Sequence, residues 1–90
     1  MSRAIVDPVE LRRFAQNLKN FNNEVGRQLS VLHGQFAGLG DTWRDQEREK
    51  FAGQFAETVQ VLTRFMETSQ LHINFLLRKA ERIDEYLQQR

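Results

Sequence analysis

Apolar residues recur every three or four positions through the N-terminal half of the chain, which is the spacing of one face of an α-helix. This stripe comprises Leu11, Phe14, Leu18, Phe21, Val25, Leu29, Leu32, Phe36 and Leu39. Residues 20–26 include three Asn and one Gly, which form helices poorly, so a break in this segment is the alternative prediction. An interrupting loop would normally shift the phase of the stripe, and the phase is kept. We therefore expect one continuous helix over about residues 8–38.

Three residues mark the start of this helix: Asp7, Pro8 and Glu10. Asp7 is a residue type that caps helices by accepting a backbone N–H of the first turn. Pro8 suits the first helical position, where its missing N–H costs nothing. Glu10 lies three residues after the cap and completes a pattern like the capping box, so the sequence predicts that the helix begins here.

A cluster of turn-forming residues follows the first stripe, namely Gly38, Gly40, Asp41 and Thr42. Glycine readily adopts the left-handed conformation that commonly ends a helix, and we expect the cluster to supply such a C-terminal cap and then a new N-cap. Acidic residues follow, where the positive end of a helix dipole favours them. The predicted turn covers about residues 39–44.

The C-terminal half carries the most regular pattern in the chain. Its apolar stripe alternates steps of four and three without a slip, and comprises Phe55, Val59, Leu62, Met66, Ser69, Ile73, Leu76, Ala80, Ile83 and Leu87. Such a seven-residue repeat favours coiled-coil-like packing. No Pro or Gly occurs after Gly53, so we expect one unbroken helix over about residues 45–88.

A second apolar stripe lies about 100° round this helix, one residue's rotation from the first. It comprises Phe51, Val61, Phe65, His72, Phe75 and Tyr86. The first helix of the same chain can cover only one stripe, and monomeric proteins rarely leave a large contiguous apolar surface exposed. We therefore expect a second hairpin, either a copy of this chain or a different one, to complete a four-helix bundle.

The predicted fold is all-α: a two-helix antiparallel hairpin that forms a single domain over residues 1–90 and pairs into a four-helix bundle dimer. The residues expected at the dimer or hairpin interface share the apolar stripes. They are Phe14, Leu18, Phe21, Phe51, Phe55, Leu62, Phe65, Met66, Ile73, Phe75 and Leu76.

Composition and charge narrow the class of partner. The 90 residues are 40% hydrophobic and 28% charged, which fits a globular domain rather than a disordered chain. The net charge of +1 provides no field to attract nucleic acid or anionic lipid. Arg78, Lys79 and Arg82 gather on one helix, but acidic residues are interleaved with them, so we interpret this cluster as a solvated face and expect no nucleic-acid partner.

No run approaches the ~20 apolar residues of a membrane span, and the N-terminus lacks the basic-then-apolar layout of a signal peptide. We therefore expect no transmembrane segment and synthesis in the cytoplasm. Secretion would use a route without a cleaved signal peptide.

Candidate catalytic and metal-binding groups are few. The chain has no Cys and two His, and neither His33 nor His72 has a His, Cys or carboxylate three or four positions away, the spacing of a helical metal pair. Most aromatic residues lie on the apolar stripes, which favours core packing over cofactor contact. We predict no enzyme activity, no cofactor and no metal site.

Trp43 differs from the other aromatic residues because it lies at the turn, off both long stripes. One interpretation is a plug that closes the end of the hairpin core, with the indole N–H turned to a carbonyl or to water. The other is an exposed anchor for a partner, since Trp is enriched among interface hot spots. Residue type and position leave both interpretations open.

The layout of capped helix, turn with Trp and longer helix resembles the WXG (Trp-x-Gly, ESAT-like) family of proteins exported by type VII secretion systems. The resemblance rests on the segment Leu39-Gly40-Asp41-Thr42-Trp43-Arg44-Asp45 and on the hairpin pattern over essentially the whole chain. Two positions depart from the family pattern. Asp45 stands where the family has Gly, and Tyr86 is followed four residues later by Arg90, where the family's C-terminal export signal has an acidic residue.

The resemblance implies a non-enzymatic dimer of hairpins, formed with itself or with a second WXG-like protein, that is exported folded as a type VII secretion substrate, adaptor or effector. Trp43, Asp45 and Gly40 would then belong to a recognition element at the turn, and a secretion ATPase is a further expected partner. The alternative function is a structural or regulatory coiled-coil module, such as a secretion chaperone or the docking subunit of a complex.

Overall fold

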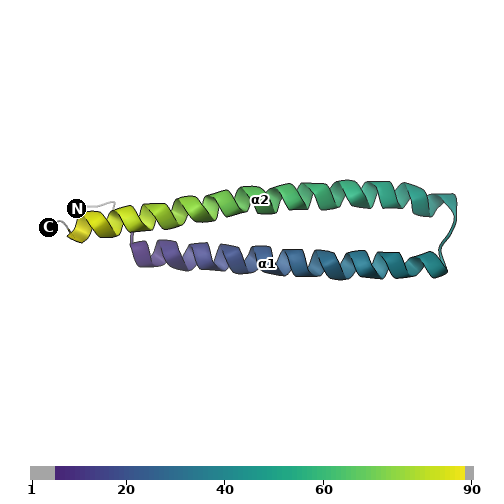
Figure 1. The fold of residues 1–90 in the computed structure, drawn as a ribbon, viewed down its shortest axis with the longest axis horizontal. Coiled ribbons are helices and arrows are strands. Elements are labelled where there is room, and N and C mark those ends of the chain that lie inside the picture. Colours follow the sequence, from purple (N-terminus) through teal and green to yellow (C-terminus); the bar gives the residue numbers. More distant parts are fainter. Residues whose placement is uncertain (1–5, 89–90) are drawn as a thin grey trace.

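A computed structural model describes residues 6–88 as one helical hairpin with extents of 69 × 18 × 17 Å (Figure 1). Helix α1 spans Pro8–Gly38, a single 3-10 turn, η1, spans Leu39–Asp41, and helix α2 spans Gln46–Gln88. The two helices run antiparallel, and the C-terminal turns of α2 project beyond the start of α1. The predicted fold class, an all-α two-helix hairpin, is confirmed.

Helix α1 begins at the predicted cap. Asp7 is extended, with φ −74° and ψ 119°, and its Oδ1 accepts the backbone N–H of Val9 at 2.9 Å. The expected capping box is wrong, because the Glu10 carboxylate instead accepts a hydrogen bond from Arg13 Nη1 at 2.9 Å, one helical turn on. The helix then continues through residues 20–26 without interruption, which confirms the prediction of one continuous helix rather than a break in this segment.

The turn forms without the expected left-handed cap. Gly38 has φ −64° and ψ −27°, and no glycine of residues 6–88 has a positive φ. Instead α1 tightens into η1, where the Leu39 carbonyl accepts the N–H groups of Thr42 at 3.0 Å and Trp43 at 2.7 Å. The last carbonyls of α1, among them those of Gln35 and Phe36, accept the N–H of Leu39, so no left-handed glycine is needed to bond them. The cap of α2 is Asp45, outside the glycine cluster, whose Oδ1 accepts the Arg48 N–H at 3.2 Å.

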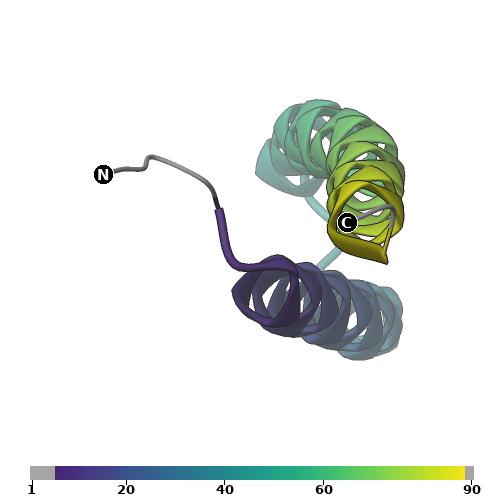
Figure 2. The ribbon, with the colours of Figure 1, turned by 90° about the vertical axis from the view of Figure 1, so that its left-hand side faces the viewer.

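The seam between the helices is thin, because two helices alone cannot enclose large side chains. The buried residues of the described part are Ala15 of α1 and Ser69, Ile73 and Ala80 of α2, and none is aromatic. The rest of the regular α2 stripe is half-buried as far as Ile83. Seen end-on, the two helices lie side by side, and no further helix of residues 6–88 covers their outer surfaces (Figure 2).

Candidate interaction surfaces

Six exposed apolar side chains, those of α1 spaced seven or eleven residues apart and so on one face of that helix, form what we call the aromatic face. It comprises Phe14, Phe21, Leu32 and Leu39 of α1 with Phe51 and Phe65 of α2. Phe21 and Phe65 meet edge to face across the seam, with ring centroids 6.1 Å apart. Each of the six side chains is at least two-fifths exposed in the single chain.

Near the turn the aromatic face is hollowed. Leu32, Gln35, Phe36, Leu39, Phe51 and Phe55 line a depression of about 260 Å³. The stacked rings of Phe51 and Phe55, with centroids 5.8 Å apart, form its α2 wall. The hollow is large enough for an apolar side chain from another molecule.

The opposite side of the hairpin has a different character. Its grooves combine small or polar residues, such as Gly26 and Thr63, with apolar residues that are already half-buried, such as Leu29, Val59 and Met66. The hairpin is therefore two-sided, with its large exposed rings gathered on the aromatic face and further round α2.

The predicted interface residues divide into two groups. Leu18, Phe55, Leu62, Met66, Ile73 and Leu76 lie half-buried or buried in the seam between α1 and α2. Phe14, Phe21, Phe51, Phe65 and Phe75 are exposed, with Phe75 half exposed and further round α2 than the aromatic face. The structure thus leaves much of the second predicted stripe uncovered by α1, and the role of the exposed group in pairing stays a prediction.

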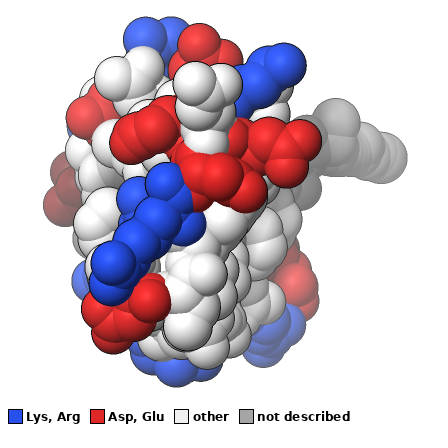
Figure 3. Space-filling view, turned by 90° about the vertical axis from the view of Figure 1, so that its right-hand side faces the viewer, with Lys and Arg blue, Asp and Glu red and all other residues white. Residues whose placement is uncertain are grey.

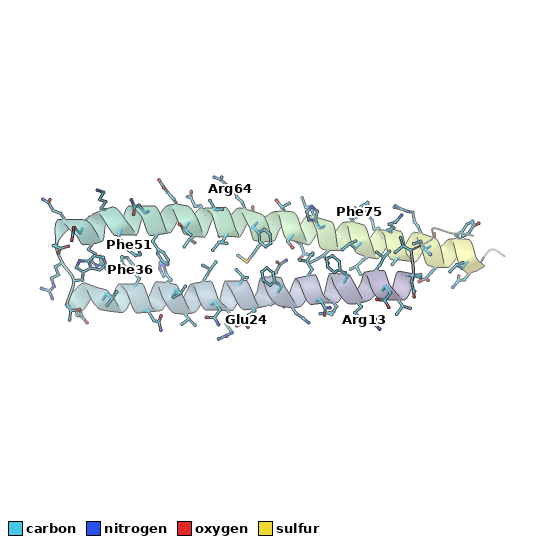
Figure 4. All side chains as sticks on the ribbon, turned by 180° about the vertical axis from the view of Figure 1, so that it is seen from behind. Arg13, Glu24, Phe36, Phe51, Arg64 and Phe75 are labelled. Atoms are coloured by element: carbon cyan, nitrogen blue, oxygen red, sulfur yellow. The ribbon has the colours of Figure 1, made fainter. Side chains whose placement is uncertain are left out.

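Charged side chains lie mainly away from the seam. Arg13 and Glu24 of α1 and Arg64 of α2 point outward, whereas Phe36 and Phe51 lie between the helices near the turn (Figure 4). Hydrogen bonds from Arg27 lower the pKa of the exposed Glu24 carboxyl, and the same pairing raises the pKa of Arg27. Around the turn, side chains of both signs surround uncharged surface (Figure 3).

At the turn, Trp43 is half-buried against the ends of both helices. Its ring lies edge to face on Phe36, with centroids 6.4 Å apart, and is tilted against Phe51 at 5.9 Å. The indole N–H donates to Asp45 Oδ1 at 2.8 Å. Trp43 and Asp45, two of the three predicted recognition residues, are therefore brought into direct contact.

Gly40, the third predicted recognition residue, lies beside Arg48. A Cβ at Gly40 would come within 3.3 Å of Arg48 Nη2. The Arg48 guanidinium stacks 4.6 Å above the centre of the Phe36 ring, and its Nη2 donates to the Phe36 carbonyl at 3.5 Å. The absence of a side chain at Gly40 thus makes room for a cation that covers the end of α1.

Two contacts between the helices were not predicted from the sequence, that of Arg48 with Phe36 and that of Asn22 with Ser69. Arg48 stands seven residues before Phe55, so the seven-residue repeat extended one step back would have placed it on the seam. Asn22 donates from Nδ2 to Ser69 Oγ at 2.9 Å, and Ser69 appears in the repeat as its one polar member. No sequence signal identifies Asn22 as its partner.

Within residues 6–88, no group of three His, Cys, Asp or Glu side chains is placed to hold a metal ion. In the same part of the chain, neither helix has a stretch that is long and apolar enough to cross a membrane. Arg90, which departs from the expected tail signal, lies outside the described residues.

The family model for proteins of 100 residues with WXG matches residues 4–86. The chain belongs to this family. Trp43 is the one Trp of this WXG protein, and Asp45 stands two residues after it. Pairing of two hairpins into a dimeric bundle is consistent with this family.

Solved structures with the same fold come from a secreted protein, EsxB, of Bacillus anthracis. A selenomethionine-labelled form is 27% identical with a TM-score of 0.83, and the match covers 96% of this chain and 98% of that one. One point mutant matches with a TM-score of 0.85, 27% identity and coverage of 94% and 96%. Another has a TM-score of 0.83, 28% identity and coverage of 96% of both chains. No curated protein matches the chain.

Proposed function

We propose that this chain is a non-enzymatic, single-domain substrate or adaptor of a type VII secretion system, and that it acts by pairing with a second hairpin. The second hairpin is a copy of itself or another WXG-like protein, and the product is a four-helix bundle. The chain is synthesised in the bacterial cytoplasm and then exported. The secretion ATPase is a further proposed partner.

The aromatic face is the observation that carries this proposal. Its six side chains are about half exposed, so covering them recovers roughly 5–9 kcal/mol, at roughly 1.5–3 kcal/mol for each fully buried side chain. In a symmetric pair each of the two chains buries its own aromatic face, so the total gain is roughly 10–18 kcal/mol. Association costs roughly 4–15 kcal/mol, so burial of the two faces is of the size that pairing requires.

The aromatic face supports pairing better than the opposite side does. The apolar residues that line its grooves, such as Leu29, Val59 and Met66, are half-buried already, whereas the six side chains of the aromatic face are exposed. The second hairpin in the proposed bundle therefore lies on the side of Phe21 and Phe65.

The secretion part of the proposal is tested in the source bacterium. The amount of this protein outside the cell is compared between a strain with its type VII secretion ATPase and a strain lacking it, with a cytoplasmic protein as the control for lysis. We expect the extracellular protein to disappear when the ATPase is deleted. Undiminished extracellular protein would contradict the secretion role and favour a structural or regulatory coiled-coil module.

A role for Trp43 in recognition is tested by Trp43→Ala. If the ring serves a partner, the variant keeps its dimer stability nearly intact but is no longer secreted. If the ring mainly fills the end of the core, the variant loses roughly 3–5 kcal/mol of stability, as for a large buried aromatic. We expect the first result, because the ring is only half-buried.

A further inference from the structure

A single carboxylate oxygen links the turn to the start of α2. Asp45 Oδ1 accepts the indole N–H of Trp43 at 2.8 Å and the backbone N–H of Arg48 at 3.2 Å. The second bond is that of a helix N-cap, since Arg48 is the third residue of α2. The first bond is of another kind, because it fixes the direction of a neighbouring ring.

Three sets of contacts hold Trp43. Its backbone N–H is bound to the Leu39 carbonyl at 2.7 Å, and its ring rests on Phe36 and Phe51. Edge-to-face and tilted arrangements of an aromatic pair are both favourable, so ring contacts alone allow more than one orientation of the indole. The hydrogen bond to Asp45 removes that freedom, since it requires the N–H to point at one oxygen.

The hydrogen bond between Trp43 and Asp45 is possible because this chain has Asp where the Trp-x-Gly motif has Gly. A glycine two residues after the Trp has no side chain and can accept no bond from the indole. An aspartate at this place can both cap the helix and accept that bond. The departure at Asp45 therefore adds an interaction at the turn.

We propose that Asp45 is a positioning residue, which fixes the Trp43 indole against Phe36 and Phe51 through its carboxylate. The tip of the hairpin then presents the apolar surface of the indole, with the N–H already bound within the chain. A partner at the tip meets an aromatic surface and not a hydrogen-bond donor. This last consequence rests on the proposed function, whereas the positioning itself does not.

Three substitutions separate positioning from capping. Asp45→Ser keeps a capping hydroxyl, but its shorter side chain does not reach the indole N–H. Asp45→Asn keeps both a cap and an acceptor oxygen at the same reach. Asp45→Ala removes both. Glu47→Gln is the matched control, because it removes one negative charge from the same helical turn at an exposed residue.

The readout is the fluorescence of Trp43, the one Trp of the chain, in the full-length protein. Time-resolved anisotropy and collisional quenching report the ratio of fixed to mobile indole, and far-UV circular dichroism reports the helix. In Asp45→Ser we expect this ratio to fall about fivefold, the typical effect of losing one hydrogen bond, with unchanged helicity. Asp45→Asn and Glu47→Gln are expected to resemble the unsubstituted chain.

Wild-type fluorescence in Asp45→Ser would overturn the proposal. Mobility in Asp45→Asn equal to that in Asp45→Ala would also overturn it, because the acceptor oxygen would then be irrelevant. If circular dichroism shows that Asp45→Ser also weakens the helix, the comparison of Asp45→Asn with Asp45→Ala replaces it. The proposal then requires a fixed indole in Asp45→Asn and a mobile indole in Asp45→Ala. Association is measured separately by sedimentation, so a chain that fails to pair would contradict the proposed function and leave the positioning result intact.

Discussion

Asn22 of α1 and Ser69 of α2, 47 positions apart in the sequence, share a hydrogen bond of 2.9 Å across the seam. Ser69 is 3% exposed, and the Asn22 Oδ1 atom is buried without a protein partner. A polar pair in an apolar seam favours one register of the two helices, because a shifted register would leave both groups unpaired.

Removing one member of this pair is expected to cost more than removing both. Ser69→Ala leaves the Asn22 amide N–H without its hydrogen-bond acceptor and should lower the free energy of unfolding by roughly 1–3 kcal/mol. The double variant Asn22→Leu with Ser69→Ala replaces both groups by apolar ones and should recover most of that loss. Urea denaturation of the three proteins measures the difference. A single variant as stable as the unsubstituted chain would show that the pair does not hold the seam.

The aromatic face predicts a loss of pairing that leaves the hairpin helical. Phe65→Ala removes a ring that is 46% exposed in the single chain and meets Phe21 across the seam. We expect the dissociation constant of the dimer to rise about tenfold to a hundredfold, because roughly 1.5–3 kcal/mol of apolar burial is lost.

The matched control for Phe65→Ala is Arg64→Ala. Arg64 is the preceding residue, and its side chain points away from the seam (Figure 4). Sedimentation velocity over a range of concentrations gives both dissociation constants. Equal constants for the two variants would place the pairing surface elsewhere.

Arg48 is expected to stabilise the turn through its stack on Phe36. Arg48→Ala removes a guanidinium 4.6 Å from the ring centre and should cost about 1 kcal/mol, the value of a partly exposed cation–π contact. Arg44→Ala is the control, because Arg44 is exposed and bonds only to the Gly40 carbonyl at 3.2 Å. Thermal unfolding followed by circular dichroism compares them, and a larger effect at Arg44 would contradict the account.

The start of α1 depends on Asp7. Asp7→Ala removes the acceptor of the Val9 N–H and should cost about 1 kcal/mol, which for a domain of this size lowers the melting temperature by about 4–8 °C. Asp7→Ser retains a capping oxygen and should restore most of this loss. A melting temperature unaffected by Asp7→Ala would mean that the first turn does not contribute to the cooperative unit.

The sequence was sufficient for features that depend on local spacing. The phase of the apolar stripes predicted the hairpin and the uninterrupted α1, and the Asp7-Pro8 pair predicted where α1 begins. It also predicted that much of the second α2 stripe would lie beyond the reach of α1. These features follow from helical periodicity and capping, which are properties of short segments.

Features that depend on how the segments meet were not predictable. Glycine at position 38 permits a left-handed cap but does not require one, and the N–H of Leu39 bonds the last carbonyls of α1 instead. The Asn22–Ser69 bond depends on the rotation of one helix against the other. The contact between Trp43 and Asp45 depends on the path of four residues between η1 and α2, which no periodic pattern describes.

The pairing of two hairpins through the aromatic face is the central claim, and sedimentation equilibrium of the purified chain at micromolar concentration tests it most directly. We predict a species of twice the 10.6 kDa chain mass, or conversion to a complex of two hairpins when a second WXG-like protein is added. A chain that stays a 10.6 kDa monomer under both conditions would contradict the account.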